Sequence, residues 1–377
     1  MTGWITETAA TTARECEREL EALVAVSSPS GDVAGGEEAV SVTSAFLPSE
    51  AEVERIPCSS EGYAPDLLAR LRGTGSARLL LIGHLDTVHS HEAHRPPVRD
   101  GDKLIGSGTV DMKGGDVIAL GLLRALVPHP AAYAEVDLLL VNDEEWRIGP
   151  LRHAESFAGW DACLCFEAGQ TGPDGGDQVV VKRKAAGTLR VTATGQSAHS
   201  GASPDKGRNA LLALVAAAQA VAGCHDPGGP DRLTAVPTVL RSGEAFNVVP
   251  DAGELYCDLR ADRLAAFDPV IAAVPDAVGG ATLSAALARQ WPGMDAREAT
   301  APLLATAAER LGRPIGGGER GGASDASHVA QYVPLTIDGL GPRGGGAHTP
   351  QEYVSLPTLR SRAEVALAIV AALLDLP

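Results

Sequence analysis

The sequence predicts an α/β fold in which a mostly parallel sheet is flanked by helices, with a smaller α+β domain inserted into it. Three observations support this prediction. Short apolar runs of strand length alternate with helix-like segments in the first part of the chain. The middle part alternates apolar and polar residues, which is typical of half-exposed antiparallel strands. The strand–helix pattern then returns near the C-terminus.

The first part of the catalytic domain is expected to span residues 1–178. A helix is expected from about Thr8 to Val26, because its apolar residues have helical spacing and a turn rich in Pro, Gly and Ser follows. A second helix, 114–126, follows a glycine-rich loop. Three apolar runs are too short for helices and are expected to be buried strands, namely 78–83, 135–141 and 161–167. Such strands form parallel sheets, whose ligand sites lie beyond the carboxyl ends of the strands.

The inserted domain is expected at 179–288. Two alternating segments and an Ala/Leu-rich helix between them support it, at 177–195, 246–262 and 208–223. The second part of the catalytic domain is expected at 289–377. It contains a helix near 301–312, an apolar segment at 333–341 and a closing helix at about 356–375.

Composition and charge narrow the functional classes. A chain of 377 residues is long enough for two domains, and its net charge of −17 argues against nucleic acid or an anionic membrane as a partner. No apolar run reaches the length of a membrane span, and the N-terminus lacks the features of a signal peptide. The six scattered cysteines fit reduced thiols. We therefore expect a cytoplasmic protein that binds a small-molecule substrate.

Imidazole and carboxylate side chains follow the predicted strands or lie in glycine-rich loops. They are His84, Asp86, Asp111, Glu144, Glu145, Glu167 and His348. Taken singly, each is more often a surface, capping or salt-bridge residue. Their occurrence at successive strand ends favours a shared role instead. Nitrogen and oxygen donors without thiolates suit Zn²⁺, and they also suit Co²⁺ or Mn²⁺.

The motifs "GHLDTV", "GSGTVDMKGG", "DEE", "FEAG" and "GAHTPQEYV" resemble, in order and spacing, those of the two-zinc (co-catalytic) metallopeptidase family. This family includes glutamate carboxypeptidases, acetylornithine deacetylases, succinyl-diaminopimelate desuccinylases and aminoacylases. The resemblance covers nearly the whole chain and is strongest to the glutamate carboxypeptidase branch. It implies a hydrolase with two Zn²⁺ ions, and a homodimer formed through the inserted domain, which also serves as a lid.

The resemblance also implies a role for each residue. His84 and Glu167 would bind one metal ion, Glu145 and His348 the other, and Asp111 would bridge the two. Glu144 would be the general base, and Asp86 would orient the imidazole of His84. In the lid, His199 would hold the developing oxyanion, commonly from the partner subunit, Asn247 would lie near the substrate, and Arg260 would receive the substrate carboxylate. An ordinary salt bridge is the alternative for Arg260.

The run Asp143, Glu144 and Glu145 is costly beside a core, because adjacent carboxylates repel one another. Two divalent cations would keep such carboxylates ionised. Successive residues of an extended chain point in opposite directions, so a local turn is needed for both glutamates to face one site. Asp143 is expected to serve the fold. Trp146 and Arg147 replace a family pattern of small residues. They could narrow the substrate pocket or pair with an anionic substrate. The alternative for Trp146 is a position in the core.

The expected function is hydrolysis of an amide or peptide bond in a small N-acyl amino acid or dipeptide-like substrate with a free carboxylate, in the manner of a carboxypeptidase. An N-deacylase or desuccinylase of the same family is one alternative. A non-hydrolytic binding protein on the same fold is another, but such a protein would be expected to lack a ligand or the base, and none is missing. An aspartic-type hydrolase would leave His84 and His348 without a purpose.

Overall fold

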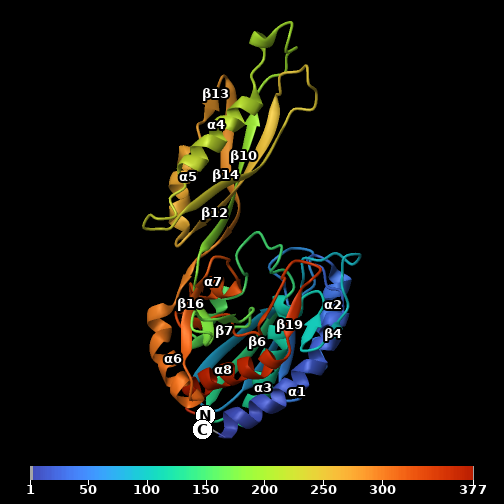
Figure 1. Cartoon of the computed structure of the whole chain (residues 1–377), viewed down its shortest axis with the longest axis vertical. Coiled ribbons are helices and arrows are strands. Elements are labelled where there is room, and N and C mark those ends of the chain that lie inside the picture. The colour runs from blue at the N-terminus through green and yellow to red at the C-terminus, as the bar shows by residue number, and fades with distance from the viewer. Residues whose placement is uncertain (1–2, 377) are drawn as a thin grey trace. The chain divides into compact units, whose positions relative to one another are not determined.

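The computed structural model describes residues 3–376 and divides the chain into two compact units. The first unit contains the residues up to Lys182, Asp295–Arg320 and the residues from Ser324 on. The second contains Arg183–Met294 and Gly321–Ala323. Each unit has a hydrophobic core of its own, and Figure 1 shows the helices and strands of both.

The first unit is built on a six-stranded sheet with the order β1-β2-β6-β3-β7-β17. Its strands are β1 (Glu52–Ile56), β2 (Asp66–Arg72), β3 (Ala77–His84), β6 (Tyr133–Val141), β7 (Ala162–Cys165) and β17 (Thr336–Ile337). The strands from β6 to β17 pair in parallel, whereas β1, β2 and β6 pair antiparallel. The predicted α/β sheet is therefore confirmed, although β1 and β2 were not predicted.

The first unit also contains helices. They are α1 (Gly3–Ala25), α2 (Val33–Ser44), α3 (Gly114–Leu126), α6 (Arg297–Leu311), α7 (Asp325–Val329) and α8 (Pro357–Leu374). Helices α1, α3 and α8 contact one another, and α3 packs on β3 and β6 (Figure 1). The first helix begins earlier than its predicted start at Thr8, because Ile5 continues its buried apolar face.

Two smaller sheets complete the first unit. One has the order β18-β19-β5-β4, and the other contains β9, paired with β8, β15 and β16. Their strands are β4 (Val98–Asp100), β5 (Lys103–Ile105), β8 (Gln170–Thr171), β9 (Asp177–Arg183), β15 (Met294–Asp295), β16 (Ile315–Arg320), β18 (Gly344–Gly345) and β19 (Tyr353–Ser355). The apolar segment 333–341 forms only the short strand β17, because Asp338 leaves the main sheet and pairs with Val180 of β9.

The second unit is an antiparallel sheet with the order β11-β12-β10-β14-β13, on which α4 packs. Its elements are β10 (Ala185–Thr194), α4 (Ala210–Gly223), β11 (Thr234–Ser242), β12 (Ala252–Ala261), α5 (Asp268–Ala273), β13 (Ala277–Val278) and β14 (Ala281–Trp291). Buried and exposed residues alternate along β10 and β14, as expected for strands with one covered face. The inserted domain was predicted at 179–288. The first limit falls within β9, which continues to Arg183, and the second falls within β14, which continues to Trp291.

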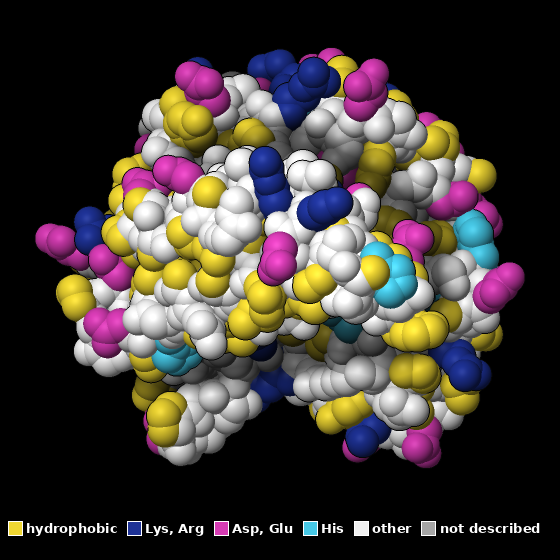
Figure 2. Space-filling view, turned by 90° about the horizontal axis from the view of Figure 1, so that it is seen from above, with side chains coloured by type: hydrophobic (Ala, Val, Ile, Leu, Met, Phe, Trp, Pro, Cys, Tyr) yellow, Lys and Arg dark blue, Asp and Glu magenta, His cyan; other side chains and the backbone are white. Residues whose placement is uncertain are grey.

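The surface mixes side chains of different kinds. Figure 2 shows apolar side chains interspersed with acidic and basic ones on the face in view. Within residues 3–376, none of the helices combines the length and the apolar character needed to cross a lipid bilayer.

Candidate metal centre

The candidate metal ligands come from strand ends and loops of the first unit. His84 is the last residue of β3, and Glu145 and Glu167 follow β6 and β7. Asp111 lies in a short turn, Thr109–Lys113, that leads into α3, and its own backbone angles are not helical. His348 lies in the loop between β18 and β19. Because β3, β6 and β7 are parallel neighbours, their carboxyl ends meet at one edge of the sheet.

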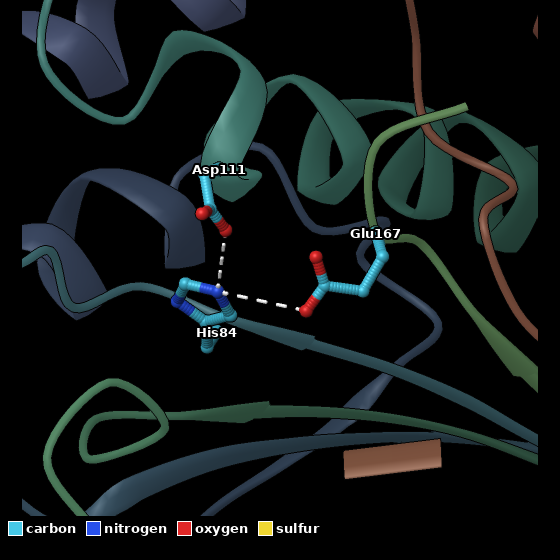
Figure 3. Close-up of side chains that lie close together, drawn as sticks. All are labelled: His84, Asp111 and Glu167. Carbon is cyan, nitrogen blue, oxygen red and sulfur yellow. Dashed lines mark hydrogen bonds and ion pairs between the residues drawn. The ribbon is translucent and has the colours of Figure 1, made fainter. Parts of the chain in front are cut away.

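One group of ligand atoms forms around His84. Its Nε2 atom lies 3.3 Å from Oδ1 of Asp111 and 3.9 Å from Oε1 of Glu167. One ligand atom from each of these three residues lies within 4.8 Å of the other two. Figure 3 shows the three side chains pointing toward one another from β3, the Asp111 turn and the segment after β7.

A second group forms around His348. Its Nε2 atom lies 3.0 Å from Oδ2 of Asp111 and 3.2 Å from Oε2 of Glu145. The ligand atoms of these residues also lie within 4.8 Å of one another. Asp111 therefore belongs to both groups and turns a different carboxylate oxygen toward each. Two imidazoles and three carboxylates, one of them shared, fit a pair of Zn²⁺ ions.

Two glycines allow the Asp111 turn to approach its neighbours. A Cβ atom on Gly115, at the start of α3, would lie 1.8 Å from the carbonyl oxygen of Phe166. Gly108, which precedes the turn, has a φ of +77°, a left-handed conformation that glycine adopts without steric cost. The glycines of "GSGTVDMKGG" thus let Asp111 reach the segment that carries Glu167.

Asp86 is buried and connects the ends of β3 and β6. Its Oδ1 and Oδ2 atoms accept the backbone N–H groups of Glu144 and Glu145, each at 3.1 Å. The Oδ1 atom also lies 3.4 Å from Nδ1 of His84. The backbone carbonyl oxygen of Asp86 lies closer to this nitrogen, at 3.0 Å. Asp86 therefore lies against the imidazole and in addition holds the backbone of the two glutamates, which the sequence did not indicate.

Burial weakens the charged forms of the two adjacent glutamates. It raises the pKa of Glu144 to about 7; the positive charge of His84 opposes this shift, and the carboxylate of Glu167 adds to it. Burial likewise raises the pKa of Glu145 to about 7, against a hydrogen bond with His348. These carboxylates are crowded and poorly hydrated, which is the condition that a nearby divalent cation relieves.

The imidazoles hold protons in the absence of metal. Hydrogen bonds with Asp111 and then Glu145 raise the pKa of His348 to about 11. Burial opposes the charged form of Asp111, but hydrogen bonds from His348 and His84 outweigh it and hold the pKa of Asp111 below its usual value. Two bound cations would replace these protons and provide the same compensation of charge.

The segment after β6 turns at Glu144–Trp146, which meets the expectation of a local turn. The backbone N–H of Arg147 donates to the carbonyl oxygen of Asp143 at 2.9 Å, and its side chain donates to Asp143 and Asp325. Arg147 is buried, so the idea that it pairs with an anionic substrate is wrong. Trp146 is 55% exposed, so a core position is also wrong.

The lid residues lie in the second unit. Nδ1 of His199 accepts the backbone N–H groups of Gly201 and Ala202 at 3.2 and 3.1 Å, so the neutral ring carries its proton on Nε2. Asn247 is exposed. Arg260 donates to Asp258 at 3.1–3.2 Å, which is the salt bridge expected as the alternative to substrate binding. His199 and Asn247 are thus accessible within their unit, whereas Arg260 already has a carboxylate partner.

The sequence did not predict a role for Glu352, whereas the resemblance places Asp325, in "GGASDASHVA" (321–330), in a family loop near the site. Both are buried carboxylates of the first unit; Asp325 holds Arg147, and Glu352 contacts the Asp111 turn. The only sign of Glu352 in the sequence is its place in "GAHTPQEYV", four residues after His348.

Comparisons with known proteins identify relatives of this chain. The family model "Peptidase family M20/M25/M40" matches residues 80–372. Carboxypeptidase G2 of Pseudomonas sp. (strain RS-16) is 26% identical over 371 residues, covering 93% of this chain and 87% of that protein. Succinyl-diaminopimelate desuccinylase of Gluconobacter oxydans is 29% identical over 333 residues, covering 81% and 84%.

Solved structures share the fold. The M20 family metallo-carboxypeptidase Sso-CP2 from Sulfolobus solfataricus superposes with a TM-score of 0.75 at 14% identity, covering 96% of this chain and 99% of that one. Aminopeptidase PepT from Bacillus cereus superposes with a TM-score of 0.74 at 20% identity, covering 96% and 98%.

Proposed function

The chain belongs to peptidase family M20/M25/M40, and from this premise we propose that it is a zinc-dependent amide hydrolase. Its substrate would be a small N-acyl amino acid or dipeptide-like molecule with a free carboxylate. The observation that supports this proposal most directly is the position of Asp111, whose two oxygens face two different groups of ligand atoms. A carboxylate in that position suits a bridge between two metal ions.

The residues present define how two ions would be held. His84 and Glu167 would bind one, Glu145 and His348 the other, with Asp111 shared between them. Two Zn²⁺ ions in these places would polarise the scissile carbonyl group and lower the pKa of the attacking water. Co²⁺ or Mn²⁺ also suits this set of nitrogen and oxygen donors.

Glu144 is proposed as the general base. Neither group of ligand atoms found among the described residues includes it, and it is only 9% exposed. Its backbone is fixed by Asp86, which leaves its carboxylate to take a proton from the attacking water and pass it to the leaving nitrogen.

The lid would complete the site. His199 presents an N–H donor on Nε2, which suits the developing oxyanion, and Asn247 would lie near the substrate. Arg260 would bind the substrate carboxylate only by exchanging its contact with Asp258. Which subunit supplies His199 depends on dimerisation.

A homodimer through the second unit is part of this proposal. Strand β11 is an edge of its sheet, and exposed apolar side chains lie on β11 and on α4. They are Leu212, Val215, Val236, Val239 and Leu240. Edge strands and apolar side chains of this kind favour association between subunits. Sedimentation of the purified chain would show a mass of two chains if this is correct.

Two substrate classes remain under the same mechanism. The match with carboxypeptidase G2 over 93% of this chain favours carboxypeptidase-like cleavage. The match with a desuccinylase over 81% favours the alternative, an N-deacylase. A screen of N-acyl amino acids and dipeptides with Zn²⁺, Co²⁺ and Mn²⁺ added separately distinguishes them by the products released. Hydrolysis must be abolished by a chelator and restored by metal. Failure of all substrates with a fully metal-loaded protein would favour a non-hydrolytic binding protein instead.

A further inference from the structure

Glu352 is a buried carboxylate that the proposed mechanism does not use. It lies immediately before β19, and its side chain reaches the segment around the Asp111 turn. Its Oε1 atom accepts the backbone N–H groups of Val110 and Asp111 at 2.9 and 3.0 Å, and its Oε2 atom accepts that of Gly108 at 2.8 Å. One side chain thus binds three backbone N–H groups from a distant part of the chain.

The backbone of Glu352 makes a further contact with the same segment. Its carbonyl oxygen accepts the N–H of Gly106 at 3.0 Å, and the following strand β19 pairs with β5. Toward the N-terminus, its own N–H donates to the carbonyl oxygen of Thr349 at 3.1 Å, and Thr349 in turn binds Gly346. The His348 loop, 346–352, is therefore braced internally and attached at Glu352 to the segment that carries Asp111.

His348 depends on this attachment. Its φ is +64°, a left-handed conformation that is uncommon for residues other than glycine and persists only where the surroundings maintain it. Its side chain is 53% exposed, so packing around the ring is limited. The ring of His348 contacts Asp111 and Glu145, but the position of its backbone depends on the anchoring of the loop, and Glu352 provides that anchor.

We propose that Glu352 is a positioning residue that couples the His348 loop to the Asp111 turn and thereby sets the metal affinity of the group formed by Asp111, Glu145 and His348. This inference rests on the proposed function. Both oxygens of Glu352 accept N–H groups, so an amide in its place would turn an NH₂ group toward at least one donor. Partners of metal ligands typically contribute about 10–100-fold to metal affinity.

The test compares Glu352→Gln with the wild-type protein by metal titration. Metal-free protein is titrated with Zn²⁺ against a chromophoric chelator, and the visible absorption spectrum is recorded with Co²⁺ bound. We expect the ion held by Asp111, Glu145 and His348 to bind about 10–100-fold more weakly, with an altered Co²⁺ spectrum. The other ion shares Asp111 but not the His348 loop, so its affinity should fall less. If Glu352→Gln does not fold, Glu352→Asp keeps the charge with a shorter reach and should weaken the same ion.

Asp137→Asn is the matched control. Asp137 is also a buried carboxylate, and it pairs with Arg70 at 3.1 Å within the main sheet. Its ion pair does not involve any of the candidate metal ligands. The Asp137→Asn protein should be less stable than the wild type but should keep the wild-type metal affinities and the wild-type Co²⁺ spectrum.

Wild-type affinities and spectrum in the Glu352 variants would overturn the inference. An equal loss of metal affinity in Asp137→Asn would also overturn it, because it would show general destabilisation. Failure of the wild-type protein to bind two ions would instead overturn the proposed function on which the inference depends.

Discussion

Replacement of Glu144 by glutamine tests the proposed general base. The amide is nearly the same size as the carboxylate, and the backbone bond from Glu144 to Asp86 does not involve the side chain that changes. Loss of the proton acceptor should lower kcat by about 10²–10⁴-fold, which corresponds to about 2.7–5.4 kcal/mol in the activation free energy.

Metal binding should survive this change. Glu144 supplies no atom to either group of ligand atoms among the described residues, and its negative charge raises the pKa of the neighbouring Glu145. Removing that charge should lower the pKa of Glu145 and make this ligand easier to deprotonate, but it also removes a negative charge that attracts the cations. Because these effects oppose each other, metal affinity should change little.

The assay measures kcat and KM on a substrate found in the screen, with metal content determined by emission spectroscopy on the same sample. Glu155→Gln, a change at an exposed carboxylate, is the control and should behave as wild type. A Glu144→Gln variant that keeps two metals and more than about a tenth of the wild-type kcat would refute its role as base. Loss of metal from this variant would show that Glu144 is a ligand instead.

Three further outcomes follow from the same structure. Without metal, His348 has a pKa of about 11 and Glu145 of about 7, so a metal ion must displace protons from them to bind. The affinity of the protein for Zn²⁺ should therefore rise between pH 6 and 8, and binding should release protons in weak buffer. An affinity that does not change with pH would contradict this. Arg147→Met leaves two buried carboxylates without the guanidinium that pairs with them, and it should lower the free energy of unfolding of the metal-free protein by about 3–5 kcal/mol. Urea unfolding measures this change, and an unchanged midpoint would contradict the structural role of Arg147. His199→Gln should lower kcat by about 10²–10³-fold, whereas His225→Gln should not; equal activities would remove His199 from the mechanism.

Much of the candidate site could be predicted because its residues follow apolar strands. His84 ends β3, and the two glutamates follow β6, so a parallel sheet was enough to predict their approach. The turn at Glu144–Trp146 was expected from the need for both glutamates to face one site. The burial of Arg147 could not be predicted in this way, because it depends on Asp325, a partner distant in the sequence.

The order of apolar runs and the types of donor residue are properties of the sequence itself, and they determined the α/β class and the nitrogen and oxygen character of the site. Only the tertiary structure decided that the two oxygens of Asp111 face different groups, that Asp86 holds the backbone of both glutamates, and that Glu352 anchors the Asp111 turn. The physical reason is that hydrogen bonds between distant segments have no local pattern. They depend on the register of the sheet and on the paths of loops, which are established when the whole core packs.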